Sequence, residues 1–249
     1  MEEPATEGWV NNGPVRLHYI DNRGAAASTL LIVPGFSSTA EGFVEIARSL
    51  LPRRCVSASL RGRGKSDTPS HGYSLDDHAG DIVSVAMGLG LRDICVMAHS
   101  RGVPYAIAFA AAHKENVRGL VLLDYPARHS RLSPAWADSF LSSDYGRSAV
   151  PGKIRLEAVR GVQVESGGEL LWDTLDGFDF PVLVVKGAKE DSLLKKEDLD
   201  LYAKHLKHGN LILLEEAGHD VWRPDLGKFV GTLNDFMDAV DGARPSHSR

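Results

Sequence analysis

Hydrophobic and polar positions divide the chain into alternating strand-like and helix-like segments. Residues 15–21 alternate between apolar and polar side chains, which is typical of a strand with one exposed face near a sheet edge. The later apolar runs are short and nearly continuous, as in parallel strands that are covered on both faces. These runs are residues 30–33, 55–58, 94–98, 120–123 and 182–185, with 211–214 as a weaker candidate.

Helical periodicity occupies the stretches between these runs. The expected helices are residues 40–51, 75–89, 103–113, 196–206 and 225–240. The second of them begins with Ser74-Leu-Asp-Asp77, which has the pattern of a capping box. Strands that alternate with helices predict an α/β fold with a mostly parallel central sheet flanked by helices.

One long stretch interrupts this alternation. Residues 125–180 contain no convincing buried strand and are punctuated by several prolines and glycines. We interpret them as a short helical cap, inserted over the carboxyl edge of the sheet. The core of the fold then consists of residues 1–124 and 181–249.

Composition and charge narrow the class of protein. The 249 residues are 43% hydrophobic and 24% charged, close to ordinary globular usage. The formal net charge of −5 argues against a nucleic-acid partner, which would need an excess of Lys and Arg. The acidic N-terminus lacks the apolar region of a secretory signal, and no apolar run approaches the roughly 20 residues that span a bilayer. We therefore expect a cytoplasmic protein with no membrane partner. Cys55 and Cys95 lie in apolar runs and are expected to be buried thiols.

The strongest chemical signal lies where the run at 94–98 ends. Ser100 follows this strand directly, and a helix begins at once after it. Ala98 and Gly102 bracket the serine in the small-x-Ser-x-small arrangement of a nucleophile elbow, a turn too tight for larger side chains. Such a turn presents the hydroxyl at a helix N-terminus, where backbone amides favour developing negative charge.

Around this turn, the chain resembles an α/β-hydrolase with a short cap, over about residues 12–241. Leu31-Ile-Val-Pro-Gly-Phe-Ser resembles the loop that supplies half of the oxyanion hole in that family, with Pro34 at a position where a His is common. The resemblance implies an oxyanion hole formed by the backbone amides of Phe36 and Arg101.

An acid and a histidine complete the family's order of Ser, acid and His. His219 follows the last expected strand in Ala-Gly-His, and the resemblance makes it the general base. Asp191 follows the strand at 182–185 and is our expected triad acid. Glu190 fits some family spacings equally well, and some members of the family carry the acid at the position of Asp124.

The other histidines receive different interpretations. His99 is expected to pack beside the elbow, close to the reacting groups. The rest are interpreted as surface residues: His18, His71, His78, His113, His129, His205, His208 and His247.

Cofactor motifs are not found in the sequence. Gly64-Lys65-Ser66 suggests a phosphate-binding loop, but Ser59 stands where that motif requires its first glycine. The chain also lacks His-Glu-x-x-His and a GxGxxG fingerprint after its first strand. We expect an enzyme without a metal or another cofactor.

The cap offers two features that bear on the substrate. Trp136, Phe140, Tyr145 and Trp172 are candidates to line an apolar acyl or aromatic pocket, or else to form the core of the cap. Six basic and three acidic side chains between Pro126 and Arg160 give this stretch a net charge of +3, and Arg101 adds a cation near the site. These charges either attract an anionic substrate or an acidic carrier protein, or are simply solvated helix faces.

Together these features predict a serine hydrolase that cleaves a small ester, thioester, lactone or amide through an acyl-enzyme. An acyltransferase, which passes the acyl group from a thioester or carrier protein to another nucleophile, has the same residues. A non-catalytic or lyase-type family member is the third alternative.

Overall fold

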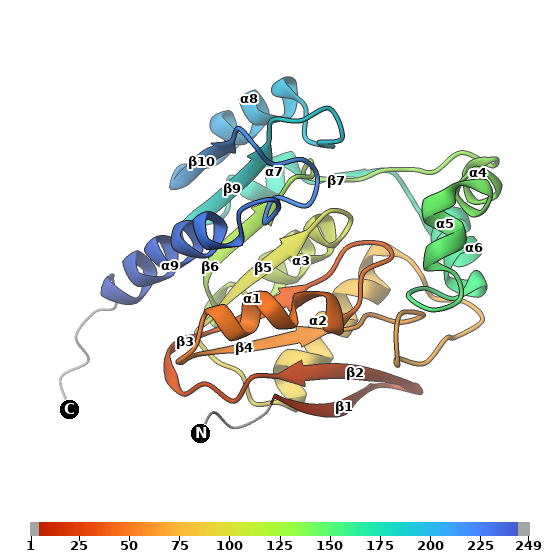
Figure 1. The fold of residues 1–249 in the computed structure, drawn as a ribbon, viewed down its shortest axis with the longest axis horizontal. Helices are drawn as coiled ribbons and strands as arrows, with labels where there is room; N and C mark the ends of the chain where they lie inside the picture. Colours follow the sequence, from red (N-terminus) through yellow and green to blue (C-terminus); the bar gives the residue numbers. More distant parts are fainter. Residues whose placement is uncertain (1–4, 244–249) are drawn as a thin grey trace.

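A computed structural model of the chain describes residues 5–243 and has a single large sheet at its centre (Figure 1). The eight strands of this sheet lie in the order β1-β2-β4-β3-β5-β6-β9-β10. The first two are antiparallel to their neighbours, and the remaining pairs are all parallel. The strands are β1 (Thr6–Asn12), β2 (Val15–Asp21), β3 (Ala26–Val33), β4 (Arg53–Ala58), β5 (Ile94–His99), β6 (Val117–Leu123), β9 (Val182–Gly187) and β10 (Gly209–Leu214).

Helices cover both faces of the sheet. Helices α1 and α9 pack on one face, while α2, α3, α7 and α8 bury their apolar side chains against the other (Figure 1). The helices are η1 (Ala40–Phe43), α1 (Val44–Ser49), α2 (Leu75–Gly88), α3 (Gly102–Ala112), η2 (Lys114–Asn116), α4 (Trp136–Ser142), α5 (Asp144–Ala149), α6 (Leu156–Glu165), α7 (Trp172–Leu175), α8 (Lys196–His205) and α9 (Leu226–Gly242). The α/β fold with a mostly parallel sheet is confirmed.

The two edge strands explain the weakest parts of the sequence pattern. The edge strand β1 was not expected, because its side chains alternate only between exposed and half-buried positions. At the opposite edge, β10 has mostly exposed side chains, which accounts for its faint apolar signal. An edge strand packs against a neighbour on one side only and needs fewer apolar residues than an inner strand.

Local capping chemistry agrees with the sequence at the start of α2. The Ser74 hydroxyl accepts a hydrogen bond from the Asp77 amide, and the Asp77 carboxylate accepts one from the Ser74 amide. This is the predicted capping box, which satisfies backbone donors that the first helical turn leaves free.

The inserted segment stands on two short strands, β7 (Arg128–His129) and β8 (Glu169–Leu170), which pair with each other. Between them, α4, α5 and α6 form a small apolar cluster of their own, set apart from the main sheet beyond the carboxyl ends of its parallel strands (Figure 1). Residues 171–180 behave differently, because Trp172, Leu175 and Phe178 are buried in the main core with α3 and α8. The raised part of the insertion is therefore shorter than residues 125–180.

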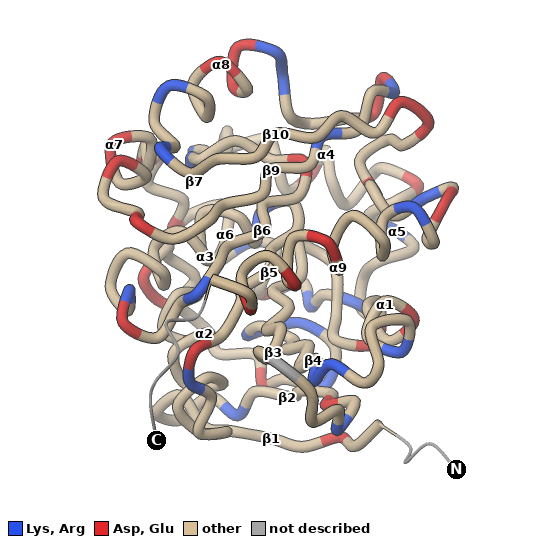
Figure 2. Tube along the Cα trace, turned by 90° about the vertical axis from the view of Figure 1, so that its left-hand side faces the viewer, with Lys and Arg blue, Asp and Glu red and all other residues tan. Residues whose placement is uncertain are grey.

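The structure also bears on the predictions about the cysteines, the charges and membrane-spanning segments. Cys55 and Cys95 are buried thiols, as predicted. Basic and acidic positions are interspersed along the trace (Figure 2). Among residues 5–243, no helix has the length and apolar character needed to cross a membrane. Residues 1–4 belong to the acidic N-terminus that we used to argue against a secretory signal, and they lie outside the described range.

The assignment of most histidines to the surface is wrong for four of them. Among the eight, these four imidazoles are buried: His18, His78, His129 and His205. Each has an acidic or cationic neighbour from a distant part of the chain, or stacks on another ring, which no local pattern can indicate. His247 lies outside the described residues.

Candidate active site

Ser100 lies in a sharp turn between β5 and α3. Its φ angle is +54°, a left-handed conformation that a non-glycine residue adopts only under strain. A Cβ atom at Gly102 would lie 2.6 Å from the Pro34 carbonyl oxygen, so no larger residue fits there. Gly35 is equally restricted, because its Cβ would lie 2.9 Å from the Cβ of Ser100. Gly102, one of the two small residues that predicted a nucleophile elbow, is thus required by close backbone packing.

His219 bridges Ser100 to a carboxylate. Its Nε2 lies 3.0 Å from Ser100 Oγ, and its Nδ1 lies 2.8 Å from Asp124 Oδ2. An ionised carboxylate can only accept hydrogen bonds, so Nδ1 carries the proton and Nε2 is free to accept from the serine hydroxyl. The loop after β10 therefore delivers a base to the hydroxyl, as the sequence predicted.

The carboxylate in this chain is Asp124, and the prediction that Asp191 contacts the imidazole is wrong. Asp191 is exposed, and its Oδ2 accepts a hydrogen bond from the backbone amide of His219 at 3.3 Å. Glu190 is exposed as well. Strand β6 is the direct neighbour of β5, and its end brings the Asp124 carboxylate to 2.8 Å from the imidazole, whereas Asp191 in the loop after β9 reaches the backbone amide of His219 instead.

Asp124 is fully buried and richly hydrogen-bonded. Its Oδ1 accepts from the Ser192 hydroxyl at 2.6 Å and from the Gly187 amide at 3.2 Å, and its Oδ2 accepts from the Leu193 amide at 2.8 Å. Burial by itself raises the pKa of Asp124, but the hydrogen bonds from His219, Ser192 and Leu193 outweigh it, and the net pKa is lowered. The carboxylate thus stays ionised while it orients the imidazole.

The two residues expected to form the oxyanion hole flank the nucleophile. Phe36 follows Gly35, which touches Ser100, and Arg101 follows Ser100 directly. Within residues 5–243, neither the Phe36 amide nor the Arg101 amide has an acceptor in the protein. The Phe36 carbonyl accepts a hydrogen bond of 3.0 Å from Arg63 Nε, which fixes the loop.

Comparisons with known proteins agree with this geometry. A family model described as the alpha/beta hydrolase fold matches residues 28–143. The crystal structure of the esterase RhEst1 from Rhodococcus sp. ECU1013 superimposes with a TM-score of 0.80 at 19% identity, covering 96% of this chain and all of the other. The chain has the α/β-hydrolase fold.

Relatives whose names state an activity share only part of their length with this chain. N-formylmaleamate deformylase from Pseudomonas putida is 30% identical over 166 residues, which cover 65% of this chain and 56% of the relative. Epoxide hydrolase 1 from Caenorhabditis elegans is 30% identical over 141 residues, 53% of this chain and 35% of the relative. The chain therefore spans about a third to just over half of these two relatives.

His99 supports the loop that carries His219. Its Nε2 lies 3.0 Å from the His219 carbonyl oxygen, which can only accept, so Nε2 carries the proton. Its ring packs edge-on against Trp222 at 4.8 Å between centroids. Burial, together with the nearby His219, lowers the pKa of His99 to about 3. The expectation that His99 packs beside the elbow is confirmed.

A buried neutral histidine of this kind makes the fold sensitive to acid. The pKa of His99 lies below that of an unfolded chain, so below about pH 6.5 the unfolded state takes up a proton that the folded state refuses. Stability is then lost as the pH falls. We expect His99→Gln, which keeps a donor for the His219 carbonyl, to reduce the loss of the urea midpoint between about pH 7 and pH 4. His71→Gln, at an exposed position, is the control, and an identical pH dependence in both variants would contradict this prediction.

Three of the four expected cap aromatics reach the site. Trp136 and Phe140 pack edge-on against the Phe36 ring, with centroids 5.0 and 5.2 Å away. The Tyr145 hydroxyl is 2.6 Å from the hydroxyl of Ser37, next to Phe36. The fourth expectation is wrong, because Trp172 is buried in the main core against Tyr202, with ring centroids 5.0 Å apart. The alternative that the sequence left open, a place in the core of the cap, does not describe Trp172 either, but Trp136 and Phe140 do pack partly buried against the apolar cluster of the cap.

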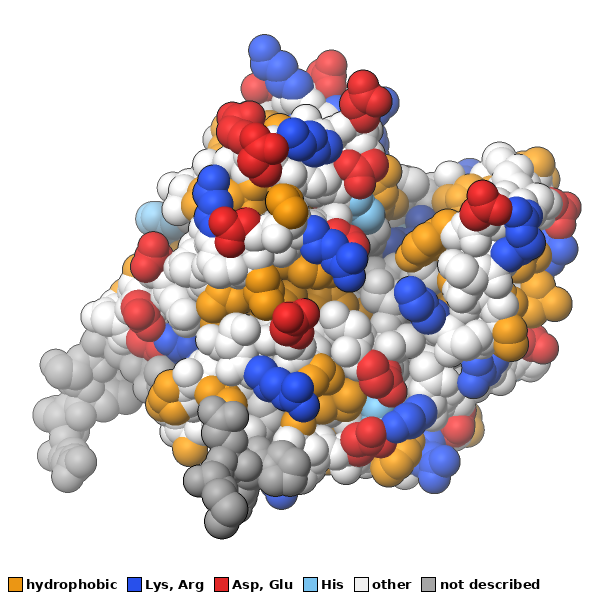
Figure 3. Space-filling model, viewed as in Figure 1, with side chains coloured by type: hydrophobic (Ala, Val, Ile, Leu, Met, Phe, Trp, Pro, Cys, Tyr) orange, Lys and Arg blue, Asp and Glu red, His pale blue; other side chains and the backbone are white. Residues whose placement is uncertain are grey.

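A cleft of about 440 Å³ adjoins His219. Figure 3 shows a hollow between the lobe of the cap and the rest of the molecule. The cleft is lined by the oxyanion loop, the cap and the loop after β10, among them Ser38, Tyr145, Asp191, His219 and Trp222. Asp191 therefore borders the site although it does not hold the imidazole.

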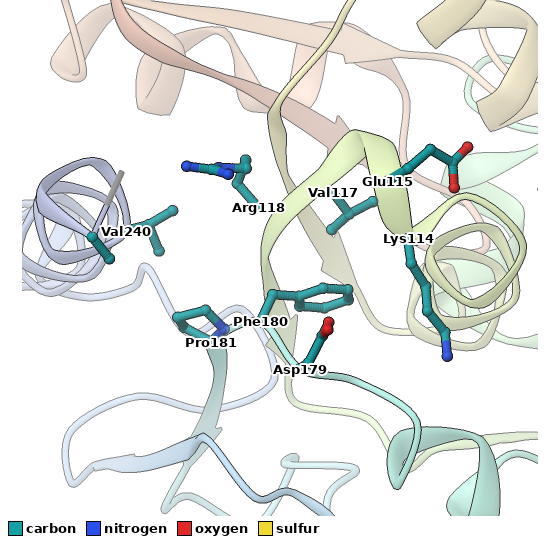
Figure 4. A pocket seen from close by; sticks show the side chains of 9 residues that line it. Lys114, Glu115, Val117, Arg118, Asp179, Phe180, Pro181 and Val240 are labelled. Atoms are coloured by element: carbon teal, nitrogen blue, oxygen red, sulfur yellow. The ribbon is translucent and has the colours of Figure 1, made fainter. Parts of the chain in front are cut away.

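A second hollow, of about 410 Å³, lies elsewhere (Figure 4). Val117 at the start of β6 and Pro181 just before β9 line it, together with Arg118, Phe180 and Val240. It therefore opens at the amino ends of strands whose carboxyl ends carry the reacting groups. Its lining contains neither the nucleophile nor the base, so we do not interpret it as the active site.

One group of side chains has the composition of a metal site. The ligand atoms of Asp173, Asp176 and His205 lie within 4.8 Å of one another. Both carboxylates are exposed, and His205 Nδ1 is already 3.2 Å from Asp176 Oδ1. An ordinary ion pair between α7 and α8 accounts for this group.

Proposed function

We propose that this chain is a serine hydrolase that cleaves a small ester, thioester, lactone or amide through an acyl-enzyme at Ser100. The observation that carries this proposal is the continuous hydrogen-bonded path from Ser100 Oγ through His219 to Asp124. A strained serine at the end of a central strand, a base within 3.0 Å and a buried carboxylate behind it are the parts that nucleophilic catalysis requires.

The proposed reaction begins when Ser100 Oγ attacks the carbonyl carbon of the substrate. His219 Nε2 takes the hydroxyl proton, and Asp124 stabilises the imidazolium that results. The carbonyl oxygen becomes an oxyanion, to which the amides of Phe36 and Arg101 donate. Collapse of this intermediate breaks the bond to the leaving group, which takes the proton from His219. Water, deprotonated by His219, then attacks the acyl group, and Ser100 regains its proton when the acid departs.

Support for a substrate with an apolar or aromatic part comes from the cap. Phe36, Trp136, Phe140 and Tyr145 form a continuous series of ring contacts that starts at Phe36, whose amide we assign to the oxyanion hole. Aromatic side chains around a few convergent polar groups are typical of small-molecule sites. These rings therefore favour a small organic acyl compound over a larger polymer.

Labelling with a fluorophosphonate probe tests the proposal directly. We expect the probe to modify Ser100 and to abolish hydrolysis of p-nitrophenyl esters or acyl thioesters. Failure to label Ser100 would favour a non-catalytic or lyase-type role. If added amines or thiols divert most of the acyl product from water, the enzyme is an acyltransferase, because its acyl-enzyme then reacts with another nucleophile first.

A further inference from the structure

Four buried polar atoms without a hydrogen-bond partner belong to neighbouring side chains beneath the cap. They are Arg63 Nη2, Arg101 Nε, Tyr105 Oη and His129 Nε2. Tyr105 stacks on His78 at 4.2 Å and lies 5.6 Å from His129, measured between ring centroids. Arg63 Nη1 in turn lies 2.8 Å from His78 Nε2. Buried polar groups normally have partners, so such a concentration of unpaired atoms indicates that something is missing from it.

The missing component is negative charge. Arg63 and Arg101 are 1% and 4% exposed, and among residues 5–243 neither has a carboxylate within salt-bridge distance. Arg61 is the contrast, because its guanidinium pairs with Asp81 at 2.6 Å. Arginine stays charged in proteins, and burying a charge without a counter-charge is costly. Burial and then the positive charge of Arg101 lower the pKa of His129, although the Glu169 carboxylate, 2.7 Å from its Nδ1, raises it.

The Arg101 guanidinium is held in place by hydrogen bonds from one of its three nitrogen atoms. Its Nη2 donates to the Ser130 carbonyl at 3.1 Å and to the Ser166 hydroxyl at 2.6 Å, at the two ends of the cap. Within the described part of the chain, the N–H groups on Nε and Nη1 have no acceptor. Both partners of Nη2 are neutral, so the charge itself remains uncompensated.

Both arginines are linked to the proposed oxyanion hole, one through the backbone and one through a hydrogen bond. Arg101 follows the nucleophile directly, and Arg63 donates to the carbonyl of Phe36. The cleft beside His219 is lined by neither arginine. His219, which has to protonate the leaving group, borders that cleft, so we assign the cleft to the leaving group and the two arginines to the acyl portion.

We propose that Arg101, supported by Arg63, recognises a carboxylate on the acyl portion of the substrate. The inference rests on the proposed function and names its substrate class: esters, thioesters or amides of dicarboxylic acids. The second carboxylate supplies the missing negative charge and accepts the unused N–H groups, a charge-assisted contact.

Long-range attraction by the exposed cap arginines is the competing explanation. Arg128 lies 3.7 Å from the carboxylate of Asp198, and Arg131 donates to the Gly167 carbonyl at 2.8 Å. Exposed charges of this kind are screened by salt, whereas a buried contact is screened much less. A preference that persists in about 0.5 M NaCl therefore favours the buried pair.

The experiment compares mono-p-nitrophenyl esters of glutarate, adipate and pimelate with the methyl esters of the same compounds. The ratio of kcat/KM for the anionic to the neutral member of each pair measures recognition of the carboxylate. We expect the wild-type ratio to exceed one for at least one chain length. We also expect the matching free dicarboxylate to protect Ser100 from the fluorophosphonate. A ratio at or below one for all three lengths would overturn the inference.

Variants locate the source of the preference. We expect Arg101→Met to lower the ratio by about 10- to 100-fold, and Arg101→Lys to retain part of it, because a charged hydrogen bond is lost in the first variant only. Arg63→Met should lower the ratio less and provides a second test if Arg101→Met does not fold. Arg131→Met, at an exposed cap arginine, is the matched control and should keep the wild-type ratio.

The outcomes separate this inference from the proposed function. If Ser100 is labelled but Arg101→Met keeps the wild-type ratio, Arg101 only fastens the cap and the inference is wrong. If Ser100 is not labelled at all, the proposed hydrolase itself fails. If Arg131→Met lowers the ratio as much as Arg101→Met, surface attraction replaces the buried contact.

Discussion

Asp124→Asn is expected to lower kcat by about ten-thousand-fold, with little change in the fold. The carboxylate accepts a hydrogen bond from the protonated Nδ1 of His219. An amide at this position can donate to Nδ1 and so favours the tautomer that carries its proton on Nε2. Nε2 then carries a proton and cannot accept one from Ser100. Steady-state kinetics on a p-nitrophenyl ester measure the effect, with circular dichroism to confirm folding.

Asp191→Asn is the matched control for this prediction. Asp191 is exposed and contacts only the backbone of the His219 loop, so its loss should lower kcat by no more than about tenfold. If instead Asp191→Asn is the severe variant and Asp124→Asn is nearly normal, the acid assigned by the geometry is wrong. A large loss in both variants would point to a shared role in placing the loop.

Ser100→Ala is expected to lower kcat by about a million-fold, because it removes the atom that forms the acyl-enzyme. The variant should bind substrate and fold normally, since alanine tolerates the φ of +54° no worse than serine. Rapid-mixing assays for a burst of p-nitrophenol, together with probe labelling, measure the loss. Turnover close to that of wild type would remove Ser100 from the mechanism.

Ser100→Gly serves as the structural control for this second prediction. Glycine adopts a positive φ without strain, so this variant should be more stable than Ser100→Ala by about 1 kcal/mol while remaining equally inactive. Thermal unfolding of the two variants makes the comparison. Equal stability would show that the turn stores no strain at this position.

Local pattern was sufficient for the inner strands, for the helices between them and for two of the three groups in the site. Apolar runs mark inner strands because both faces of those strands are buried, and small residues beside Ser100 mark a turn that needs them. His219 follows from its place after the last strand. The edge strand β1 escaped detection because an edge strand needs few apolar side chains.

Choice of the acid required information that no local pattern contains. Asp124 and Asp191 both follow buried strands, and only the positions of their side chains in the folded chain show that Asp124 is the one that reaches the imidazole. Trp172 and the buried histidines were misplaced for a similar reason. Their surroundings are built from segments that meet only after folding, such as Trp172 against Tyr202 from α8.

The position of Asp124 on the neighbouring strand has a consequence for protein engineering. Nucleophile and acid belong to one right-handed crossover, β5-α3-β6 with Asp124 at its end, and only the imidazole arrives from a remote loop. That crossover is a compact, portable module of consecutive residues. Grafting it onto another doubly wound sheet would require a recipient that contributes a single histidine and donors for the carboxylate, rather than three separately placed side chains.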